Sequence, residues 1–266
     1  MGTIFCSVGV KKGIEWDYIV APSMMLDVQY RMHPMIVIFP SKEFYNRSLR
    51  NGTVDSNGVT SPGLQPPVSQ HLPKDARTGN RPSVVFLDHT GRESTSSRSW
   101  VNKTEGYIVR SIVEDLLLNN EGDLRGYDIG IITPYAAQVT YLTRLLKGEK
   151  QQARFRKVLG DKLTMELWNI EIKTVDGFEG REKEVIIFST VRNNEGGYIG
   201  FLADRRRLNV ALTRARRGLF VVGSLDTLKN GKVGDKLKSR VGKGAESWHR
   251  YAEYVSDGGL VERVVA

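Results

Sequence analysis

Short apolar runs alternate with helical patterns along most of this chain, and this alternation limits its fold more than any other feature. The fourfold spacing of Ile108, Ile112 and Leu116 predicts a helix over residues 104–118. Short apolar runs separated by helices are typical of a mainly parallel sheet with helices on both faces. We therefore predict an α/β fold. The predicted strands are 84–87, 128–133, 170–175, 185–190 and 219–223, and the other predicted helices are 136–146, 206–216 and 248–255.

Length and charge limit the functions that such a chain can have. With 266 residues it is long enough for one large domain with a sizeable core. Lys and Arg number 39 against 30 Asp and Glu, and the net charge of +9 favours a polyanionic partner such as nucleic acid. Cys6 is the only cysteine, which excludes an intrachain disulfide and fits an intracellular compartment, cytoplasmic or nuclear.

Two classes of protein are not expected from these residues. No apolar run approaches the ~18 residues that a membrane-spanning helix needs, so we expect no membrane partner. The four histidines are scattered, and no Cys/His cluster has the spacing of zinc ligands. We therefore predict no metal site made by this chain alone.

Changes in composition divide the chain into parts. Residues 1–24 show no clear period and are predicted to be an irregular N-terminal segment. The domain itself is predicted over 25–230. Within it residues 51–82 are predicted to be a long loop, because five of the nine prolines fall between positions 62 and 82. Residues 231–266 are predicted to be a C-terminal tail with a short helix.

Hydroxyl and turn residues follow three of the predicted strands. Ligands of a parallel sheet bind at the carboxyl ends of its strands, so we expect a site at this edge. The three stretches are Thr133-Pro134-Tyr135, Thr174-Val175-Asp176-Gly177 and Thr190-Val191-Arg192.

An arginine-rich stretch, LNVALTRARR, runs from residue 208 to residue 217. On a helix Leu208, Leu212 and Ala215 would form one apolar stripe, and Arg214 would project from its flank. A guanidinium held on a rigid helix can contact a phosphoryl group as an arginine finger. A solvated basic helix end explains the same pattern and is the simpler interpretation on helix geometry alone, and the residues leave both interpretations open.

A glycine-containing stretch lies between two predicted strands. Gly177 and Gly180 could let backbone N–H groups approach a ligand, and Glu182 could accept hydrogen bonds from ribose hydroxyls. A charged loop between strands explains the same residues, and for the glycines alone it is the simpler interpretation.

Tyr30 and Arg31 are adjacent, so they could stack on a base and contact a phosphate respectively. These residues are weak evidence by themselves. His33 follows closely, and we interpret it as a hydrogen-bonded structural residue rather than a catalytic base.

The four motifs in their order resemble the second RecA-like domain of superfamily-1B helicases, in the group of the nonsense-mediated-decay helicase and the senataxin-like enzymes. The resemblance covers about residues 25–225 and implies the second domain of a RecA-like P-loop NTPase. The stretches that carry it are LDVQYRMHP, IGIITPYAAQ, KTVDGFEGREKEVIIFSTVR and GFLADRRRLNVALTRARRGLFVVG.

The resemblance also implies roles for individual residues. Tyr30 would stack near adenine, and Arg31 would reach the γ-phosphate of ATP. Gly180 and Glu182 would belong to the motif that links nucleotide and nucleic acid, with Glu182 toward the ribose, and Arg214 would be the arginine finger. The residues that would line the track of single-stranded RNA or DNA are Thr133, Pro134, Tyr135 and Thr174.

Parts of a complete motor of this kind are absent from the sequence. Neither Gly231-Lys232 nor Gly242-Lys243 has the upstream glycine of a Walker A motif, and the chain has no Asp-Glu pair of the Walker B type. We expect the phosphate cradle and the Mg²⁺ ligands to come from a first RecA-like domain, upstream or in another protein. The isolated chain would then be catalytically inactive. Glu179 departs from the family, which usually has Gln, and this change weakens the expected contact with phosphate.

Three functions remain open at this point. The first, which we favour because Arg31, Glu182 and Arg214 are all present, is the C-terminal motor domain of an ATP-dependent helicase. The second is a non-catalytic module that binds nucleic acid or protein and retains the fold. The third is a regulatory partner that lends Arg214 to the ATP site of another protein. The sequence does not select RNA over DNA.

Overall fold

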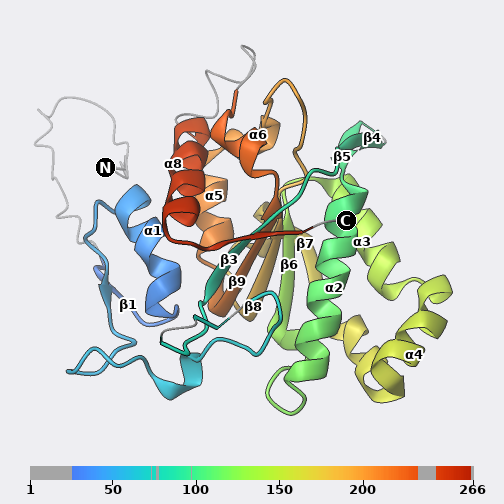
Figure 1. Ribbon diagram of the computed structural model, residues 1–266, viewed down its shortest axis with the longest axis horizontal. Coiled ribbons are helices and arrows are strands. Elements are labelled where there is room, and N and C mark those ends of the chain that lie inside the picture. The colour runs from blue at the N-terminus through green and yellow to red at the C-terminus, as the bar shows by residue number, and fades with distance from the viewer. Residues whose placement is uncertain (1–25, 73, 76–77, 97, 233–243, 265–266) are drawn as a thin grey trace, which may run out of the picture.

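The core of the protein is a six-stranded sheet in which all strands are parallel (Figure 1). The computed structural model describes residues 26–72, 74–75, 78–96, 98–232 and 244–264, so the predicted irregular segment 1–24 lies outside it. The strand order is β10 (Val261–Arg263), β3 (Val84–Asp88), β9 (Ala215–Gly223), β8 (Lys183–Ser189), β6 (Ile129–Thr133) and β7 (Glu171–Thr174). The predicted mainly parallel α/β sheet is confirmed.

Helices cover both faces of the sheet, as predicted (Figure 1). In β3, Val84 and Phe86 point into one core cluster and Val85 and Leu87 into the other, because successive side chains of a strand alternate between faces. One face carries α2 (Lys103–Asn119), α3 (Ala136–Lys147) and α4 (Glu149–Glu166). The other face carries α1 (Pro34–Phe44), α5 (Arg205–Leu212), α6 (Leu225–Lys229) and α8 (Gly244–Asp257).

Two small sheets lie outside this core. β1 (Val28–Gln29) pairs in parallel with β2 (Arg50–Asn51). β4 (Ser94–Ser96) pairs with β5 (Ser99–Val101) in an antiparallel hairpin beside the start of α2. The predicted loop 51–82 contains little regular structure in its described part. It is nevertheless anchored to the domain, because Leu72 is fully buried and the Ser69 hydroxyl donates to Asp115 at 2.6 Å.

The predicted helix 206–216 was wrong at its C-terminal end. α5 ends at Leu212, and Ala215 already belongs to β9. Helical spacing continues through this stretch, but pairing of β9 with both β8 and β3 overrides it. Arg214 therefore lies at the junction between a helix and a strand, and the apolar stripe that was to include Ala215 does not form.

The C-terminal segment, predicted as a tail with a short helix, packs into the same domain. The helix is present as α8, and its Trp248 and Tyr251 are buried against the sheet. The Trp248 indole donates to the carbonyl of Leu202 at 2.7 Å. β10 then adds an edge strand beside β3. These contacts join the described residues of this segment to the core.

His33 caps the first helix, which confirms its interpretation as a structural residue. It is the N-cap of α1, and its Nδ1 accepts a hydrogen bond from the amide of Met35 at 3.1 Å. Burial lowers the pKa of His33 below its ordinary value. Both observations describe an imidazole that the fold keeps neutral.

This cap should make stability depend on pH. The unfolded chain binds a proton at His33 more readily than the folded one, so stability should fall as the pH drops from 7.5 to 5. Because a protonated Nδ1 cannot accept the Met35 hydrogen bond, about 1 kcal/mol should be lost, the usual value of an N-cap. His33→Asn keeps an acceptor that does not titrate. Urea unfolding should therefore show a smaller loss for this variant, and an equal loss would contradict the role of His33.

Candidate functional site

The predicted site residues fall on two opposite edges of the sheet. Because the strands are parallel, all of them start at one edge and end at the other. Glu182 directly precedes β8 and Arg214 directly precedes β9, whereas Thr133 and Thr174 are the last residues of β6 and β7. A strand of seven residues such as β8 is roughly 23 Å long, so two separate sites are present. The expectation that all ligands bind at the carboxyl edge applies to only one of them.

At the amino edge, Arg31 and Glu182 contact each other. Their side chains form an ion pair, and Arg31 Nη1 also donates to the carbonyl of Thr213 at 3.1 Å. Both side chains are partly exposed, so the pair is worth only about 0–1 kcal/mol. A polyphosphate could therefore replace the carboxylate of Glu182 as the partner of Arg31.

Arg214 lies in the same place and is held by neutral acceptors. Its Nε donates to the carbonyl of Val210 at 3.2 Å, its Nη1 to the carbonyl of Arg181 at 3.4 Å and its Nη2 to the hydroxyl of Thr213 at 3.1 Å. Burial, and then the nearby charge of Arg31, lower the pKa of the Arg214 guanidinium. An anion placed here would relieve both penalties.

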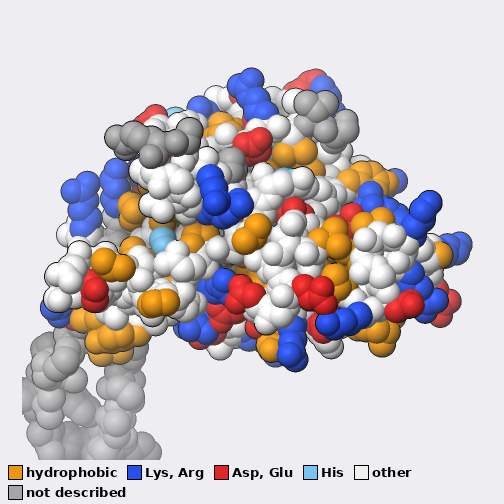
Figure 2. Space-filling view, turned by 60° about the horizontal axis from the view of Figure 1, so that its bottom comes forward, with side chains coloured by type: hydrophobic (Ala, Val, Ile, Leu, Met, Phe, Trp, Pro, Cys, Tyr) orange, Lys and Arg blue, Asp and Glu red, His pale blue; other side chains and the backbone are white. Residues whose placement is uncertain are grey.

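Four other arginines near this edge differ from Arg214 because they pair with a carboxylate. Figure 2, in which the lower side of Figure 1 comes forward, shows basic and acidic side chains interleaved. Among the residues that the structure describes, Arg214 has no ion pair with a carboxylate. The paired arginines are Arg31 with Glu182, Arg181 with Glu171, Arg216 with Glu184 and Arg217 with Asp123.

Tyr30 presents an aromatic ring to solvent near this edge. Its side chain is 74% exposed, and the ring lies so close to Gly52 that a Cβ there would be 2.2 Å from Cε1. Glycine at position 52 thus lets the loop support the ring. Tyr30 and Arg216 line one open hollow of about 590 Å³, whose other wall is formed by residues 52–64. A planar ligand could stack on the exposed face of this ring.

The stretch between β7 and β8 connects the two edges without an α-helix and contains only the short 3-10 helix Asp176–Phe178. It leaves the carboxyl end of β7 at Thr174 and enters the amino end of β8 at Lys183. On the way Phe178 is buried over Gly130 of β6, where a Cβ would be 2.6 Å from its ring. Gly180 has φ +74°, a conformation that glycine adopts without strain. This crossing segment, residues 175–182, therefore touches both predicted sites.

At the carboxyl edge the structure corrects part of the prediction. Thr133 is fully buried, and Tyr135 is 2% exposed, so neither side chain faces solvent. The Tyr135 hydroxyl instead donates to the carbonyl of Ile199 and accepts from Arg192, both at 3.3 Å. Pro134 and Thr174 are partly exposed. In this conformation these two can line a nucleic-acid track, and Thr133 and Tyr135 can only support it.

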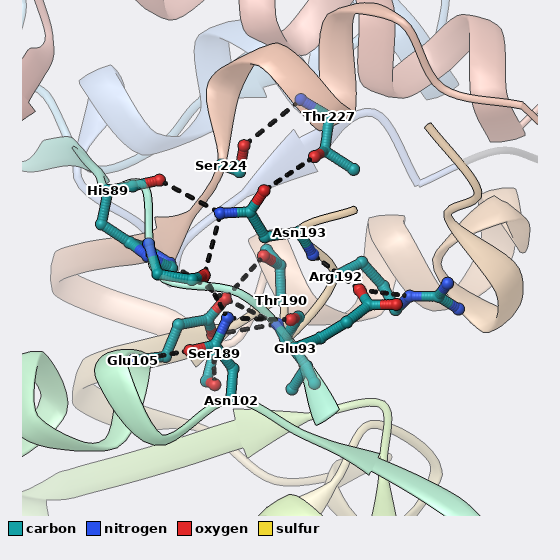
Figure 3. A network of polar contacts seen from close by, with 12 residues as sticks. His89, Glu93, Asn102, Glu105, Ser189, Thr190, Arg192, Asn193, Ser224 and Thr227 are labelled. Atoms are coloured by element: carbon teal, nitrogen blue, oxygen red, sulfur yellow. Dashed lines mark hydrogen bonds and ion pairs between the residues drawn. The ribbon is translucent and has the colours of Figure 1, made fainter. Parts of the chain in front are cut away.

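The sequence reasoning missed a buried polar network beneath this edge (Figure 3). At its centre is the fully buried carboxylate of Glu105, in the first turn of α2. It accepts from the hydroxyl of Ser189 at 2.5 Å and from the amide of Val191 at 2.8 Å, and it lies 3.3 Å from His89 Nε2. Val191 has φ +72°, which costs an L-residue roughly 1–2 kcal/mol. Glu105 thus holds a strained turn at the end of β8.

The next residue after this turn is also held on several sides. The Arg192 side chain is 7% exposed, pairs with Glu93 at 2.9 Å and stacks 4.5 Å from the ring centre of Trp100. One local signal could have drawn attention to this region. Asn102 and Glu105 have the three-residue spacing of a capping box, which marks a helix start. The tertiary structure directs Glu105 to Val191 instead.

The described residues contain neither a cluster of metal ligands nor a membrane-spanning helix. They contain no group of three or more His, Cys, Asp or Glu side chains that could hold a metal ion. No helix in the described ranges is both long and apolar enough to cross a membrane.

Together, the parallel sheet covered by helices and the arginines at its amino edge define a RecA-like helicase domain. The chain belongs to the family described as AAA domain, whose model matches residues 13–226. Relatives at 35% and 40% identity are a DNA helicase and a regulator of nonsense transcripts, which confirms the resemblance to this group of helicases.

Three relatives illustrate the likeness. DNA polymerase alpha-associated DNA helicase A of Saccharomyces cerevisiae is 35% identical over 239 residues, covering 87% of this chain and 31% of that protein. Regulator of nonsense transcripts 1 of Dictyostelium discoideum is 40% identical over 217 residues, covering 80% and 14%. The Arabidopsis thaliana homolog of the latter is 39% identical over 204 residues, covering 75% and 14%. The chain thus spans less than a third of each of these relatives.

Proposed function

We propose that this chain is the C-terminal motor domain of an ATP-dependent helicase that acts on single-stranded RNA or DNA. The observation that carries the proposal is Arg214, a half-buried guanidinium with neutral acceptors and no carboxylate ion pair in the described part of the chain. A charge that lies beside Arg31 and forms no ion pair with a carboxylate in the described part of the chain is suited to a transferring phosphoryl group.

Each nucleotide contact has a candidate residue at the amino edge. Arg214 would stabilise negative charge on the γ-phosphoryl group, and Arg31 would exchange Glu182 for a phosphate oxygen. Glu182, once released, could accept from a ribose hydroxyl, and Tyr30 offers an open ring to adenine. The backbone cradle and the ligands of Mg²⁺ would come from a first RecA-like domain, upstream or in trans. The isolated chain would therefore not hydrolyse ATP.

The crossing segment supports a motor over a passive binding platform. Residues 175–182 run from the track residue Thr174 to the nucleotide residue Glu182, and Asp176 is held by α5 through a two-point pair with Arg207 at 2.7 and 2.8 Å. A shift of the segment at one edge would move groups at the other. Nucleotide and strand binding should therefore be coupled.

A reconstitution experiment tests the proposal. The chain would be mixed with a separately purified first RecA-like domain of a nonsense-transcript regulator, and phosphate release would be measured with and without oligo-uridine. We expect hydrolysis only from the mixture, with stimulation by the strand. Robust ATP hydrolysis by the chain alone would contradict the proposal that a first RecA-like domain supplies the phosphate cradle and the Mg²⁺ ligands. Strand binding that is indifferent to nucleotide would favour the non-catalytic platform.

Glu179 permits a second test near the phosphates. This carboxylate is exposed, and its charge acts on both Arg207 and Arg214. Glu179→Gln removes a negative charge and restores amide donors, so the reconstituted pair should bind ATP about threefold more tightly, as expected for one partly screened charge. The matched control is Glu195→Gln, another exposed carboxylate, on the loop after β8. Weaker ATP binding by Glu179→Gln than by this control would contradict the expectation.

A further inference from the structure

We propose that the groove between the β4–β5 hairpin and α3 binds the phosphodiester backbone of single-stranded nucleic acid and extends the track beyond Pro134. This inference rests on the proposed function. The groove has a volume of about 500 Å³. Its walls are β4 and the flanking residues of β5 on one side and the first three turns of α3 on the other.

The chemistry of the groove is that of a phosphate-binding surface. Lys103 and Arg144 line it, and no carboxylate does. Both cations are exposed, and within the described part of the chain neither forms an ion pair. This contrasts with the interleaved charges of the amino edge. The side-chain hydroxyls of the lining belong to Ser94, Thr95, Ser96, Ser99, Thr140 and Tyr141.

The position of the groove makes it continuous with the predicted track. Ala136 and Ala137 belong to its lining and follow Pro134 after one residue. In Figure 1 the hairpin stands beside the start of α3, above the carboxyl edge of the sheet. A single-stranded nucleic acid that contacts Pro134 and continues past the start of α3 would enter the groove directly, without changing direction.

The walls of the groove are preorganised. The amide of Ala137 donates to the hydroxyl of Ser99 at 3.3 Å, which ties α3 to β5. The ring of Trp100, on β5, is stacked by Arg192 from the end of β8. Asn102 is fully buried, and its amide nitrogen Nδ2 donates to the carbonyls of Gly91 and Val191 at 2.9 and 3.2 Å. A ligand would bind without paying to order this hairpin.

The lining favours nucleic acid over an acidic protein segment. It contains no Leu, Ile, Met, Phe or Trp, so it lacks the large apolar anchors that usually dominate protein interfaces. A lining of hydroxyls and cations suits a repeated phosphate and predicts little sequence preference. The remaining aromatic ring, that of Tyr141, could stack on one base.

The test compares two double variants of the whole chain. Lys103→Gln with Arg144→Gln removes both groove cations. Lys150→Gln with Lys157→Gln, both on α4, removes the same charge elsewhere. Binding to a fluorescent 15-nucleotide oligo-uridine would be followed by anisotropy between 50 and 300 mM NaCl. At 50 mM the groove variant should bind about tenfold more weakly, and the slope of log K against log salt should fall by about 1.4 for two lost phosphate contacts.

The comparison of the two double variants bears on the groove alone, whereas absence of wild-type binding would also count against the proposed track. Equal binding by the two double variants would overturn the proposal, as would absence of wild-type binding at 50 mM salt. Displacement of the strand by polyglutamate at equal charge would also overturn it, in favour of an acidic protein partner. As a check on folding, both double variants should have the same urea midpoint of unfolding as the wild type. The proposed motor function is judged separately, by hydrolysis of the wild-type chain mixed with the first RecA-like domain.

Discussion

Replacing Arg214 by alanine should lower ATP hydrolysis by the reconstituted pair of domains about 10³-fold or more, the effect of losing an arginine finger. The expected result follows from the surroundings of the side chain. Its guanidinium is oriented by three neutral acceptors, and its charge is held beside Arg31 with no carboxylate ion pair in the described chain. Phosphate release at saturating ATP would measure the loss in the rate, separately from any change in affinity.

Two variants make this result specific. Arg214→Lys keeps the charge and loses the planar fork, so its rate should lie between those of the wild type and Arg214→Ala. Arg206→Ala removes an exposed arginine of α5 and should leave the rate within about twofold of the wild type, since surface changes rarely matter. Equal rates for Arg206→Ala and Arg214→Ala would remove the finger role.

Replacing Glu105 by alanine should destabilise the domain by about 3–5 kcal/mol, the usual cost of breaking a buried charged network. The fully buried carboxylate accepts hydrogen bonds from Ser189 and from the amide of Val191, whose strained conformation it holds. Without it these donors lose their partner, and the turn that leads to Arg192 loses its support. Urea unfolding followed by circular dichroism would measure the change.

The control for this prediction is an exposed carboxylate on the neighbouring loop. Glu195→Ala removes a side chain that pairs with Arg92 in solvent, and its cost should stay within about 0.5 kcal/mol. A midpoint for Glu105→Ala that matches that of Glu195→Ala would show that the network does not carry stability. If Glu105→Ala stays folded but no longer binds single-stranded nucleic acid, Glu105 would also be needed to position the residues of the predicted track.

Local patterns were sufficient for most strands of the main sheet, though not for β10, and for naming charged residues that the structure brings together. Each buried strand is a continuous apolar run, so β3, β6, β8 and the apolar part of β9 could be located without knowledge of their partners. The motifs named Arg31, Glu182 and Arg214, and these meet at one edge of the sheet.

Contacts between residues far apart in the chain could not be predicted from local sequence patterns. The end of α5 at Leu212 follows from strand pairing across the sheet, which helical spacing does not reveal. Burial of Tyr135 involves a distant segment, because its side chain contacts Arg192, Ile199 and Phe201. Glu105 and Val191 are 86 residues apart, and their hydrogen bond exists only because α2 packs beside the end of β8.

The sequence by itself therefore determined the α/β class, the order of its strands along the chain and the charged residues suited to a phosphate, because these depend on neighbours within a few positions. The tertiary structure alone decided that the two groups of predicted site residues lie on opposite edges and that residues 175–182 join them. It also decided that Arg214 has no ion-paired carboxylate among the described residues. Those properties depend on contacts between segments that are far apart in the chain and become buried against each other. No local sequence pattern encodes such contacts.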